Sequence, residues 1–137
     1  MNKNQKTISP ENLGSAIVEG LELYRNSVRL TVDKCGAKAI NNLVRKTKDT
    51  APFDAKHHGK HYVDCIAKKA EKGRTGATTY TWYVKDPCYR LTHLLVNGHA
   101  KRNGGRTKKD PFLKNAVEEV TEQYQNDVIE AVKKLDS

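Results

Sequence analysis

The sequence predicts an α+β domain in which two long helices, one near each end of the chain, pack against a small antiparallel β-hairpin. Three patterns indicate this architecture. Apolar residues recur every three or four positions from Leu13 to Leu43, side chains alternate along residues 78–85, and a seven-residue apolar rhythm runs from Leu113 to Leu135. A short helix and a basic loop separate the hairpin from the last helix. With 137 residues, the chain is expected to form a single domain spanning residues 1–137.

The first helix is expected to begin at residues 9–12, where a capping serine precedes a first-turn proline, and residues 1–9 are expected to form a flexible N-terminus. The apolar stripe extends to about Lys46, so an unbroken helix would be roughly 50 Å long at about 1.5 Å per residue. That length exceeds the diameter of a 15.4 kDa globule, so part of the stripe would need another subunit to cover it. A bend or break is expected near Gly20, because glycine destabilises helix interiors.

The hairpin is predicted from the middle of the chain. Residues 48–60 have no regular period and indicate a loop, whereas residues 61–68 alternate and predict a first strand. Glycines within residues 71–77 indicate a turn. Residues 78–85 predict the second strand, because aromatic residues and threonines dominate them. Asp-Pro at residues 86–87 ends this strand, since proline lacks the N–H that a strand ladder requires.

A short helix is predicted after the hairpin and is expected to end at Gly98, where glycine most easily adopts the left-handed conformation. Residues 98–110 follow as a basic loop that two adjacent glycines are expected to keep mobile. Asp-Pro at residues 110–111 is typical of an N-cap followed by a first-turn proline and predicts the start of the last helix. The leucines that share one face of the short helix are Leu91, Leu94 and Leu95.

Charge is unevenly distributed along a chain whose net charge is +9 and whose isoelectric point is about 9.5. Residues 115–137 have a net charge of −4, whereas the preceding basic segment has six cations against Asp110, a net charge of +5. A basic loop beside an acidic helix is expected of subunits that pack head to tail in a ring, although a solvated surface with ordinary charge scatter would look similar. The six candidate contact residues are Lys101, Arg102, Arg106, Lys108, Lys109 and Lys114.

These cations could contact DNA phosphates or acidic surfaces of adjoining subunits. The sequence contains no helix-turn-helix, zinc-finger or aromatic stacking motif, so sequence-specific DNA binding is not expected. Tyr80, Trp82 and Tyr83 could stack on bases, but aromatic residues on a strand are more often core.

Histidines and cysteines offer a weak case for a metal site. His57, His58, His61 and Cys65 lie close in sequence, but the second ligand pair of a typical zinc site is missing. No nucleophile stands beside a base, so neither catalytic residues nor a cofactor are expected and the chain is interpreted as a non-enzyme. His93 is expected to be partly buried on the short helix.

Cys35, Cys65 and Cys88 are an odd number without metal-binding spacing, which favours reduced thiols in a cytoplasmic setting. The N-terminal segment lacks the apolar core of a signal peptide, and no apolar run is long enough to span a membrane. A soluble protein made in the cytoplasm is therefore expected.

Three sequence pieces carry a family resemblance. The first is Thr-Ala-Pro at residues 50–52, followed by a polar loop and the predicted strand. The second is YRLTHLL at residues 89–95, running into Gly-His-Ala at 98–100. The third is Asn-Gly-Gly-Arg at residues 103–106, leading to Pro-Phe-Leu at 111–113 and then Ala116. Together these pieces resemble the tail-completion, or minor tail component, proteins of long-tailed bacteriophages.

The resemblance extends from about residue 28 to residue 131, with two departures. Val96-Asn97 stands where members usually have an acidic residue before the glycine. Residues 54–59 replace the aspartate-threonine-glycine stretch that often follows the proline. The residues that match the family motif are Ala51, Pro52, Leu91, His93, Leu94, Leu95, Gly98, His99, Pro111, Phe112 and Leu113.

The resemblance implies a virion protein of the neck or tail end that joins tails to DNA-filled heads. Its implied partners are further copies of itself, in a ring, and neighbouring neck and tail proteins, with possible non-specific contact to DNA in the channel and none to membranes. The alternative is a small basic protein that binds DNA without sequence preference, since the net charge of +9 attracts polyanions.

Overall fold

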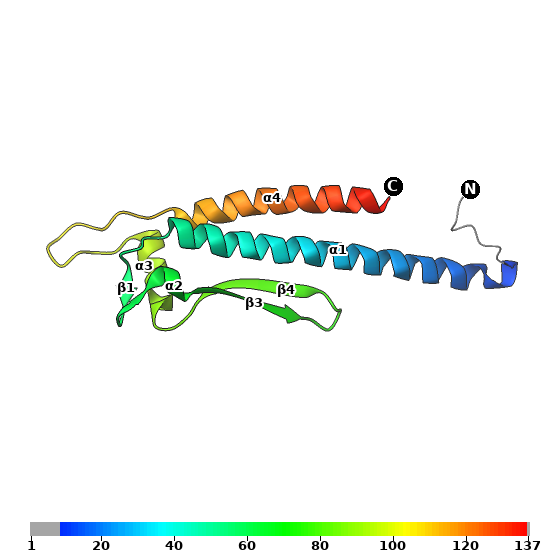
Figure 1. Cartoon of the computed structure of the whole chain (residues 1–137), viewed down its shortest axis with the longest axis horizontal. Coiled ribbons are helices and arrows are strands. Elements are labelled where there is room, and N and C mark those ends of the chain that lie inside the picture. The colour runs from blue at the N-terminus through cyan, green and yellow to red at the C-terminus, as the bar shows by residue number, and fades with distance from the viewer. Residues whose placement is uncertain (1–8, 137) are drawn as a thin grey trace.

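The computed structural model describes residues 9–136 and shows an elongated α+β molecule built around one helix, α1 (Leu13–Thr50). Helix α4 (Phe112–Leu135) runs antiparallel to α1 on one side, and a hairpin of β3 (Ile66–Lys72) and β4 (Thr78–Val84) lies along another side (Figure 1). The predicted fold class and the two long helices are therefore confirmed.

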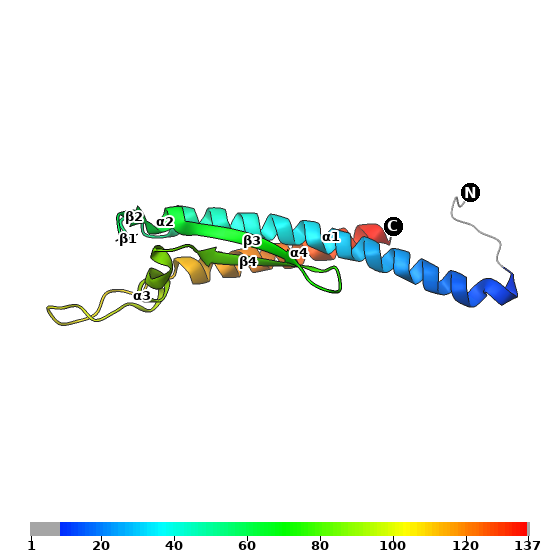
Figure 2. The ribbon, with the colours of Figure 1, turned by 90° about the horizontal axis from the view of Figure 1, so that it is seen from below.

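Small elements gather at the end of the molecule where α1 finishes. They are the two-residue strands β1 (Lys56–His57) and β2 (Lys60–His61), the one-turn helix α2 (Tyr62–Cys65), the 3-10 turn η2 (Cys88–Arg90) and α3 (Leu91–Asn97). The loop between α3 and α4 projects beyond them, and a second view confirms that it extends the long axis (Figure 2).

Helix α1 is longer than its apolar pattern indicates. It spans 38 residues, about 57 Å, and is preceded by the 3-10 turn η1 (Pro10–Asn12). Of the bend or break expected near Gly20, the break is wrong, because α1 is continuous across that position, whereas the bend stays a prediction. The helix also continues to Thr50, past the expected end at Lys46. Ser9 does precede the first turn, but its side chain accepts a hydrogen bond from the Asn12 side chain and caps no backbone N–H.

The predicted first strand is wrong over most of its length. Residues 61–68 were expected to alternate between two faces, yet Tyr62, Val63, Cys65 and Ile66 are all buried. A strand cannot turn consecutive side chains to the same side, whereas one helical turn can. The chain therefore makes α2 first, and β3 begins only at Ile66 and continues to Lys72.

The second strand was predicted within one residue. β4 pairs antiparallel with β3, from Ile66 opposite Val84 to Lys72 opposite Thr78. Trp82 and Val84 pack against the core, and the Tyr80 hydroxyl donates to the Asp33 carbonyl of α1 at 3.1 Å. The interpretation of Tyr80 and Trp82 as packing residues is confirmed.

The segment predicted as a loop at residues 48–60 contains the last turn of α1 and a small β1–β2 hairpin. His58 and Gly59 form its two-residue turn, and both have positive φ angles of 49° and 79°. Two consecutive positive φ angles are what a type I′ hairpin turn requires.

The main core lies at the crowded end of the molecule. Ala51, Tyr62, Cys88 and Phe112 come from four segments that are far apart in sequence, and their side chains are buried together with Val63, Cys65 and Ile66. Tyr62 and Phe112 meet edge to face, with ring centroids 6.0 Å apart. This core fixes the end of α1, the hairpin, α3 and the start of α4 relative to one another.

Replacing either of two glycines of α1 with alanine is expected to change stability in opposite directions. A Cβ at Gly36 would lie 2.8 Å from the Tyr80 ring, whereas a Cβ at Gly20 would meet no atom within 4 Å. We expect Gly36→Ala to lower the melting temperature, because Tyr80 and β4 must shift. Gly20→Ala should instead strengthen the helix by up to about 1 kcal/mol. Thermal unfolding and hydrogen exchange of the two variants check this, and equal behaviour would contradict the packing of β4 on α1.

Candidate interaction surfaces

The basic loop forms a protruding two-stranded ribbon. We call residues 98–110 the basic arm. Ala100 and Arg106 form a β-bridge, the Thr107 N–H donates to the His99 carbonyl at 2.9 Å, and the Lys101 N–H donates to the Gly105 carbonyl at 3.0 Å. The expected mobility of this segment stays a prediction, but its backbone has a hydrogen-bonded shape that places its tip beyond the body of the molecule (Figure 1).

Gly98 fixes the base of the basic arm. It follows α3 with the expected positive φ angle, 71°, but its ψ angle of 169° is extended and not left-handed helical. A Cβ at this position would also lie only 2.5 Å from the Thr107 carbonyl oxygen on the returning strand of the arm. Glycine is therefore required both by the backbone angle and by the close approach of the second strand.

The start of α4 closes the other end of the basic arm. The Asp110 carboxylate accepts a hydrogen bond from the Phe112 N–H at 3.0 Å, and the Asp110 N–H donates to the Leu95 carbonyl at 2.9 Å. The helix starts one residue later than predicted, because Pro111 is the N-cap and Asp110 is the residue before it. The Asp110 side chain still satisfies one of the N–H groups that a helix leaves unpaired.

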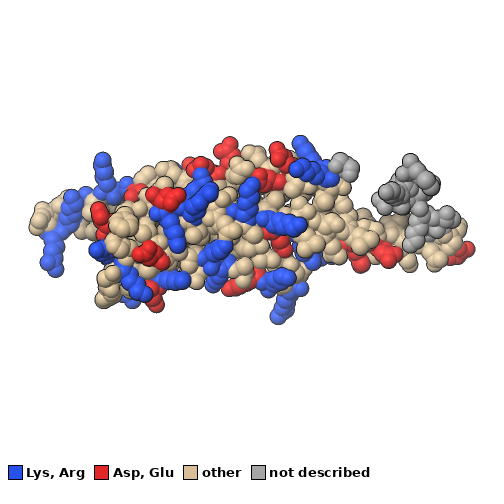
Figure 3. All heavy atoms as spheres, in the orientation of Figure 1, with Lys and Arg blue, Asp and Glu red and all other residues tan. Residues whose placement is uncertain are grey.

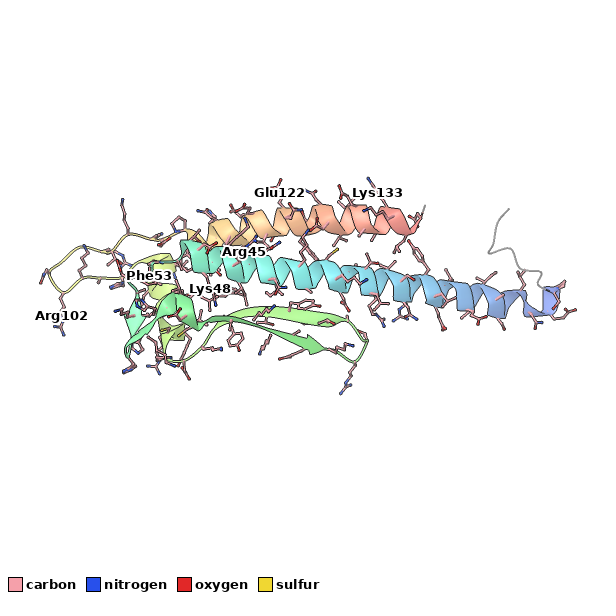
Figure 4. All side chains as sticks on the ribbon, in the orientation of Figure 1. Arg45, Lys48, Phe53, Arg102, Glu122 and Lys133 are labelled. Carbon is pink, nitrogen blue, oxygen red and sulfur yellow. The ribbon has the colours of Figure 1, made fainter. Side chains whose placement is uncertain are left out.

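Five of the six candidate cations lie on the arm, and all of them are exposed. The arm has five cations and one acid, a net charge of +4. Arg102 lies near the tip and points away from the body (Figure 4). Arg106 also has a structural contact, since its guanidinium donates to the Gly98 carbonyl at 3.4 Å. The sixth cation, Lys114, lies on α4 and is 4.0 Å from Glu118, so it does not belong to the arm.

Most residues of the family motif are structural. Ala51 and Phe112 belong to the buried core, and Leu91, Leu95 and Leu113 pack against it, whereas Leu94 and Pro52 are half-buried. His99, His93 and Pro111 are exposed, so the expectation that His93 is partly buried is wrong. His93 is therefore free to turn to solvent on a short helix, of which only one face meets the core. The motif thus describes how the arm is held more than what the arm contacts.

An apolar helical surface lies at the opposite end of the molecule. We call residues 9–24, which comprise η1 and the first turns of α1, the α1 overhang, because they extend past the end of α4 (Figure 1). Four residues of the predicted apolar stripe, Leu13, Ile17, Leu21 and Tyr24, are 51%, 53%, 63% and 45% exposed. Full burial of one such side chain is worth roughly 1.5–3 kcal/mol, so the overhang holds considerable unused binding energy.

Tyr24 marks where the covered part of α1 begins. Its hydroxyl donates to the Asp136 carboxylate at the end of α4, at 3.2 Å, and the nearby carboxylate raises the pKa of the Tyr24 phenol. Beyond this point the stripe follows the path that α4 would take if α4 were longer. The surface of this helix is therefore built for contact with a second element that the described chain does not supply.

The α1 overhang is also acidic. Glu11, Glu19 and Glu22 give residues 9–24 a net charge of −3 with no lysine or arginine, and no described residue forms an ion pair with them. Figure 3 shows acidic atoms and no basic atoms on this part of the molecule. This acidic surface was not predicted from the sequence, although the absence of lysine and arginine from residues 9–24 indicates it.

Three of the six acids in residues 115–137, where an acidic surface was expected, form ion pairs within the chain. Asp127 lies 3.3 Å from Lys38 of α1, Glu119 lies 2.5 Å from Lys46, and Glu118 faces Lys114. Each pair has at least one exposed partner, so each contributes little to stability. They nevertheless reduce the charge that α4 can offer to a second molecule.

Two exposed aromatic residues lie among the small elements at the same end of the molecule as the basic arm, and neither was among the candidate contact residues. Phe53, labelled in Figure 4, is 66% exposed. It stacks on His61 with ring centroids 4.4 Å apart, and the His61 ring donates to the Phe53 carbonyl at 2.7 Å. Tyr89, 47% exposed, lies on η2 beneath Arg90. We call the arm together with Phe53 and Tyr89 the arm end.

An open groove of about 300 Å³ runs between α1, α4 and β4. Gly36, Ile40 and Leu43 of α1 form its floor, with Tyr80 on one wall and Tyr124 on the other. Its lining contains no charged side chain, and it does not join the basic arm to the overhang.

The histidines and cysteines do not converge. Within residues 9–136, no group of three or more His, Cys, Asp or Glu side chains is placed to hold a metal ion. His57 and His58 contact each other edge to face at 4.2 Å, whereas Cys65 and Cys88 lie in the core. The Cys88 thiol donates to the Lys60 carbonyl at 3.4 Å. Burial, together with the neighbouring Cys65 thiol, raises the pKa of Cys88 to about 11.

Comparison with known proteins adds no relative: no protein-family model, no curated protein and no solved structure matches this chain. None of the helices formed by residues 9–136 has the length and apolar character needed to cross a membrane.

Stability is expected to be sensitive to substitution of Gly98 at the base of the basic arm. We expect Gly98→Ala to destabilise the fold by about 1–3 kcal/mol, because it combines a positive φ angle with a backbone clash. Gly104→Ala is the matched control, since Gly104 also has a positive φ angle of 89° but no neighbour within 4 Å. Urea unfolding measures both variants. A loss at Gly98 no larger than that at Gly104 would contradict the close contact with Thr107.

The thiols are expected to differ in reactivity. Cys35 is partly exposed, whereas Cys88 is buried with a raised pKa, so far less of it is thiolate at neutral pH. We therefore expect iodoacetamide to label Cys35 well before Cys88 in the native protein, and to label all three cysteines at similar rates in denaturant. Peptide mass spectrometry follows each site, and rapid native labelling of Cys88 would refute its placement in the core.

Proposed function

We propose that this chain is a structural protein of a bacteriophage particle, which completes the neck or tail end and joins the tail to the DNA-filled head. It acts by associating with copies of itself and with neighbouring neck and tail proteins, and it performs no catalysis. The resemblance of residues 89–116 to tail-completion proteins supplies the family. The observation that carries the proposal is the α1 overhang, a long apolar helical surface that nothing in the described chain covers.

The build of the molecule supports an assembly role on physical grounds. A monomer that works alone gains nothing from several exposed large apolar side chains on one helix, because such surfaces promote association. Here Leu13, Val18, Leu21 and Leu23 are all more than half exposed. At the far end, the basic arm projects from a rigid base held by Gly98 and Asp110, as suits a segment that reaches a neighbour.

The alternative function is non-specific DNA binding, which the exposed cations of the basic arm favour. Phosphate contacts of this kind weaken steeply as salt concentration rises. Tyr80 and Trp82 are engaged with α1, through a bond to Asp33 and a 2.9 Å hydrogen bond from the Trp82 indole to Thr47, so they are not presented to bases. DNA binding through the arm would therefore depend on charge and not on stacking.

Neutralising the basic arm tests the proposal and separates it from the alternative. The variant replaces five cations with alanine: Lys101, Arg102, Arg106, Lys108 and Lys109. In phage particles that depend on this chain, we expect separate filled heads and tails in electron micrographs, because the arm no longer holds its neighbour. A small DNA-binding protein instead predicts lost retention of naked DNA in gel shifts, with normal joining of heads and tails.

The control removes the same charge from exposed cations elsewhere in the chain: Lys34, Lys48, Lys72, Arg74 and Lys85. Circular dichroism establishes that both variants keep the fold. Normal yields of joined particles with the arm variant, or complete particles without the chain, would rule out the proposed role.

A further inference from the structure

We infer that the α1 overhang of one copy binds the arm end of a second copy. The contact joins opposite ends of the elongated molecule and is therefore head to tail. It rests on the proposed function and deepens it, because it names the surfaces through which copies would associate.

The overhang requires a partner that buries its apolar stripe. Tyr24 contacts Asp136, so the stripe faces the side of α1 on which α4 lies, at the point where α4 ends. Residues 1–8 contain two apolar side chains, Met1 and Ile8, whereas the stripe exposes four large ones. A second copy brings Phe53 and Tyr89, exposed aromatic side chains that lie at its arm end.

Charge selects the arm end over a second overhang. Two overhangs side by side would bring six carboxylates together, and like charges disfavour such a contact. With Lys3 and Lys6 counted, residues 1–24 of each copy still have a net side-chain charge of −1. The arm end instead supplies five exposed cations with one acid among them, so the overhang and the arm have opposite net charges of −3 and +4.

Charge also selects the overhang over α4 as the surface that the arm meets. Three of the five α4 carboxylates, Glu118, Glu119 and Asp127, already lie within 4.0 Å of lysines of their own chain. Lys133 and Lys134 in the last turn of α4 further reduce its negative charge, whereas the overhang contains no cation. Glu11, Glu19 and Glu22 have no such partner among the described residues. They lie on the side of the overhang away from the apolar stripe, where a protruding ribbon can reach past the helix.

The two surfaces differ, so each copy keeps one of each kind free for a further copy. Head-to-tail contacts of this kind close into rings when the rotation between copies allows it and otherwise form filaments. The opposite ends of the molecule in Figure 3 show this polarity, with basic atoms gathered at the arm and acidic atoms on the overhang.

The experiment reverses charge at each surface and then mixes the variants. The overhang variant is Glu11→Lys, Glu19→Lys and Glu22→Lys. The arm variant is Lys101→Glu, Arg102→Glu and Lys108→Glu, which leaves Arg106 and its bond to Gly98 in place. The control variant is Glu118→Lys, Glu122→Lys and Glu130→Lys, which has the same net charge as the overhang variant but changes α4.

We expect each surface variant alone to self-associate at least about tenfold more weakly than the natural chain, because three pairs of like charges then oppose the contact. Mixing the two surface variants should restore association, since the unchanged arm of one meets the unchanged overhang of the other and the two reversed surfaces also match. Sedimentation velocity at low salt measures the natural chain, the three variants and the mixture, and circular dichroism checks their fold.

Three outcomes would overturn the inference: a natural chain that stays monomeric at its highest attainable concentration, a mixture that remains dissociated, or a control variant that dissociates as much as the overhang variant. These results are distinct from failure of the proposed function. A mixture that reassembles while particles form without the chain would refute the virion role and keep the interface. A chain needed for joined particles whose variants do not reassemble would refute the interface alone.

Discussion

The structure depends on the length of α1. At 38 residues this helix is longer than α4, which has 24, and far longer than the hairpin, whose strands have seven residues each. A helix buries its apolar stripe only where another element lies against it. Because α4 and the hairpin both reach α1 from its C-terminal end, the uncovered part falls entirely at the other end. The polarity of the molecule follows from this mismatch in length.

Where α1 is covered, polar contacts position the packing. Thr47 is completely buried, and its hydroxyl donates to the Leu43 and Val44 carbonyls of its own helix while it accepts the Trp82 indole N–H at 2.9 Å. A buried indole N–H needs such a partner, because leaving it unpaired costs about 1–3 kcal/mol. This bond sets the position of β4 along α1, and the approach of Tyr80 to Gly36 sets its distance.

The basic arm has little core of its own and is held at both ends. Gly98 admits the returning strand at Thr107, and Asp110 bonds both Leu95 behind it and Phe112 ahead of it. The motif that resembles tail-completion proteins is therefore a description of these anchors and of the leucines beneath them. Its exposed members are few, so the resemblance says more about how the arm is presented than about which molecule the arm meets.

The amino-acid sequence alone determined those elements whose geometry is set by residues close to one another along the chain. The apolar repeat of α1, the alternation of residues 78–84, the glycine at residue 98 and the aspartate at residue 110 each specify backbone geometry through interactions a few residues away. The strand predicted over residues 61–66 is wrong, because most side chains there are buried and do not alternate between two faces. A one-turn helix forms instead, since contacts with the core outweigh the local preference for a strand.

Only the tertiary structure decided which apolar and charged residues remain available. Leu13 and Leu43 belong to the same stripe, yet Leu43 is half-buried and Leu13 is 51% exposed, because α4 ends between them. Glu119 and Glu22 are both helical carboxylates, yet only Glu119 finds a lysine across the helix interface. Such differences depend on contacts between segments that are distant in sequence. The pattern of residues within one segment carries no information about those contacts.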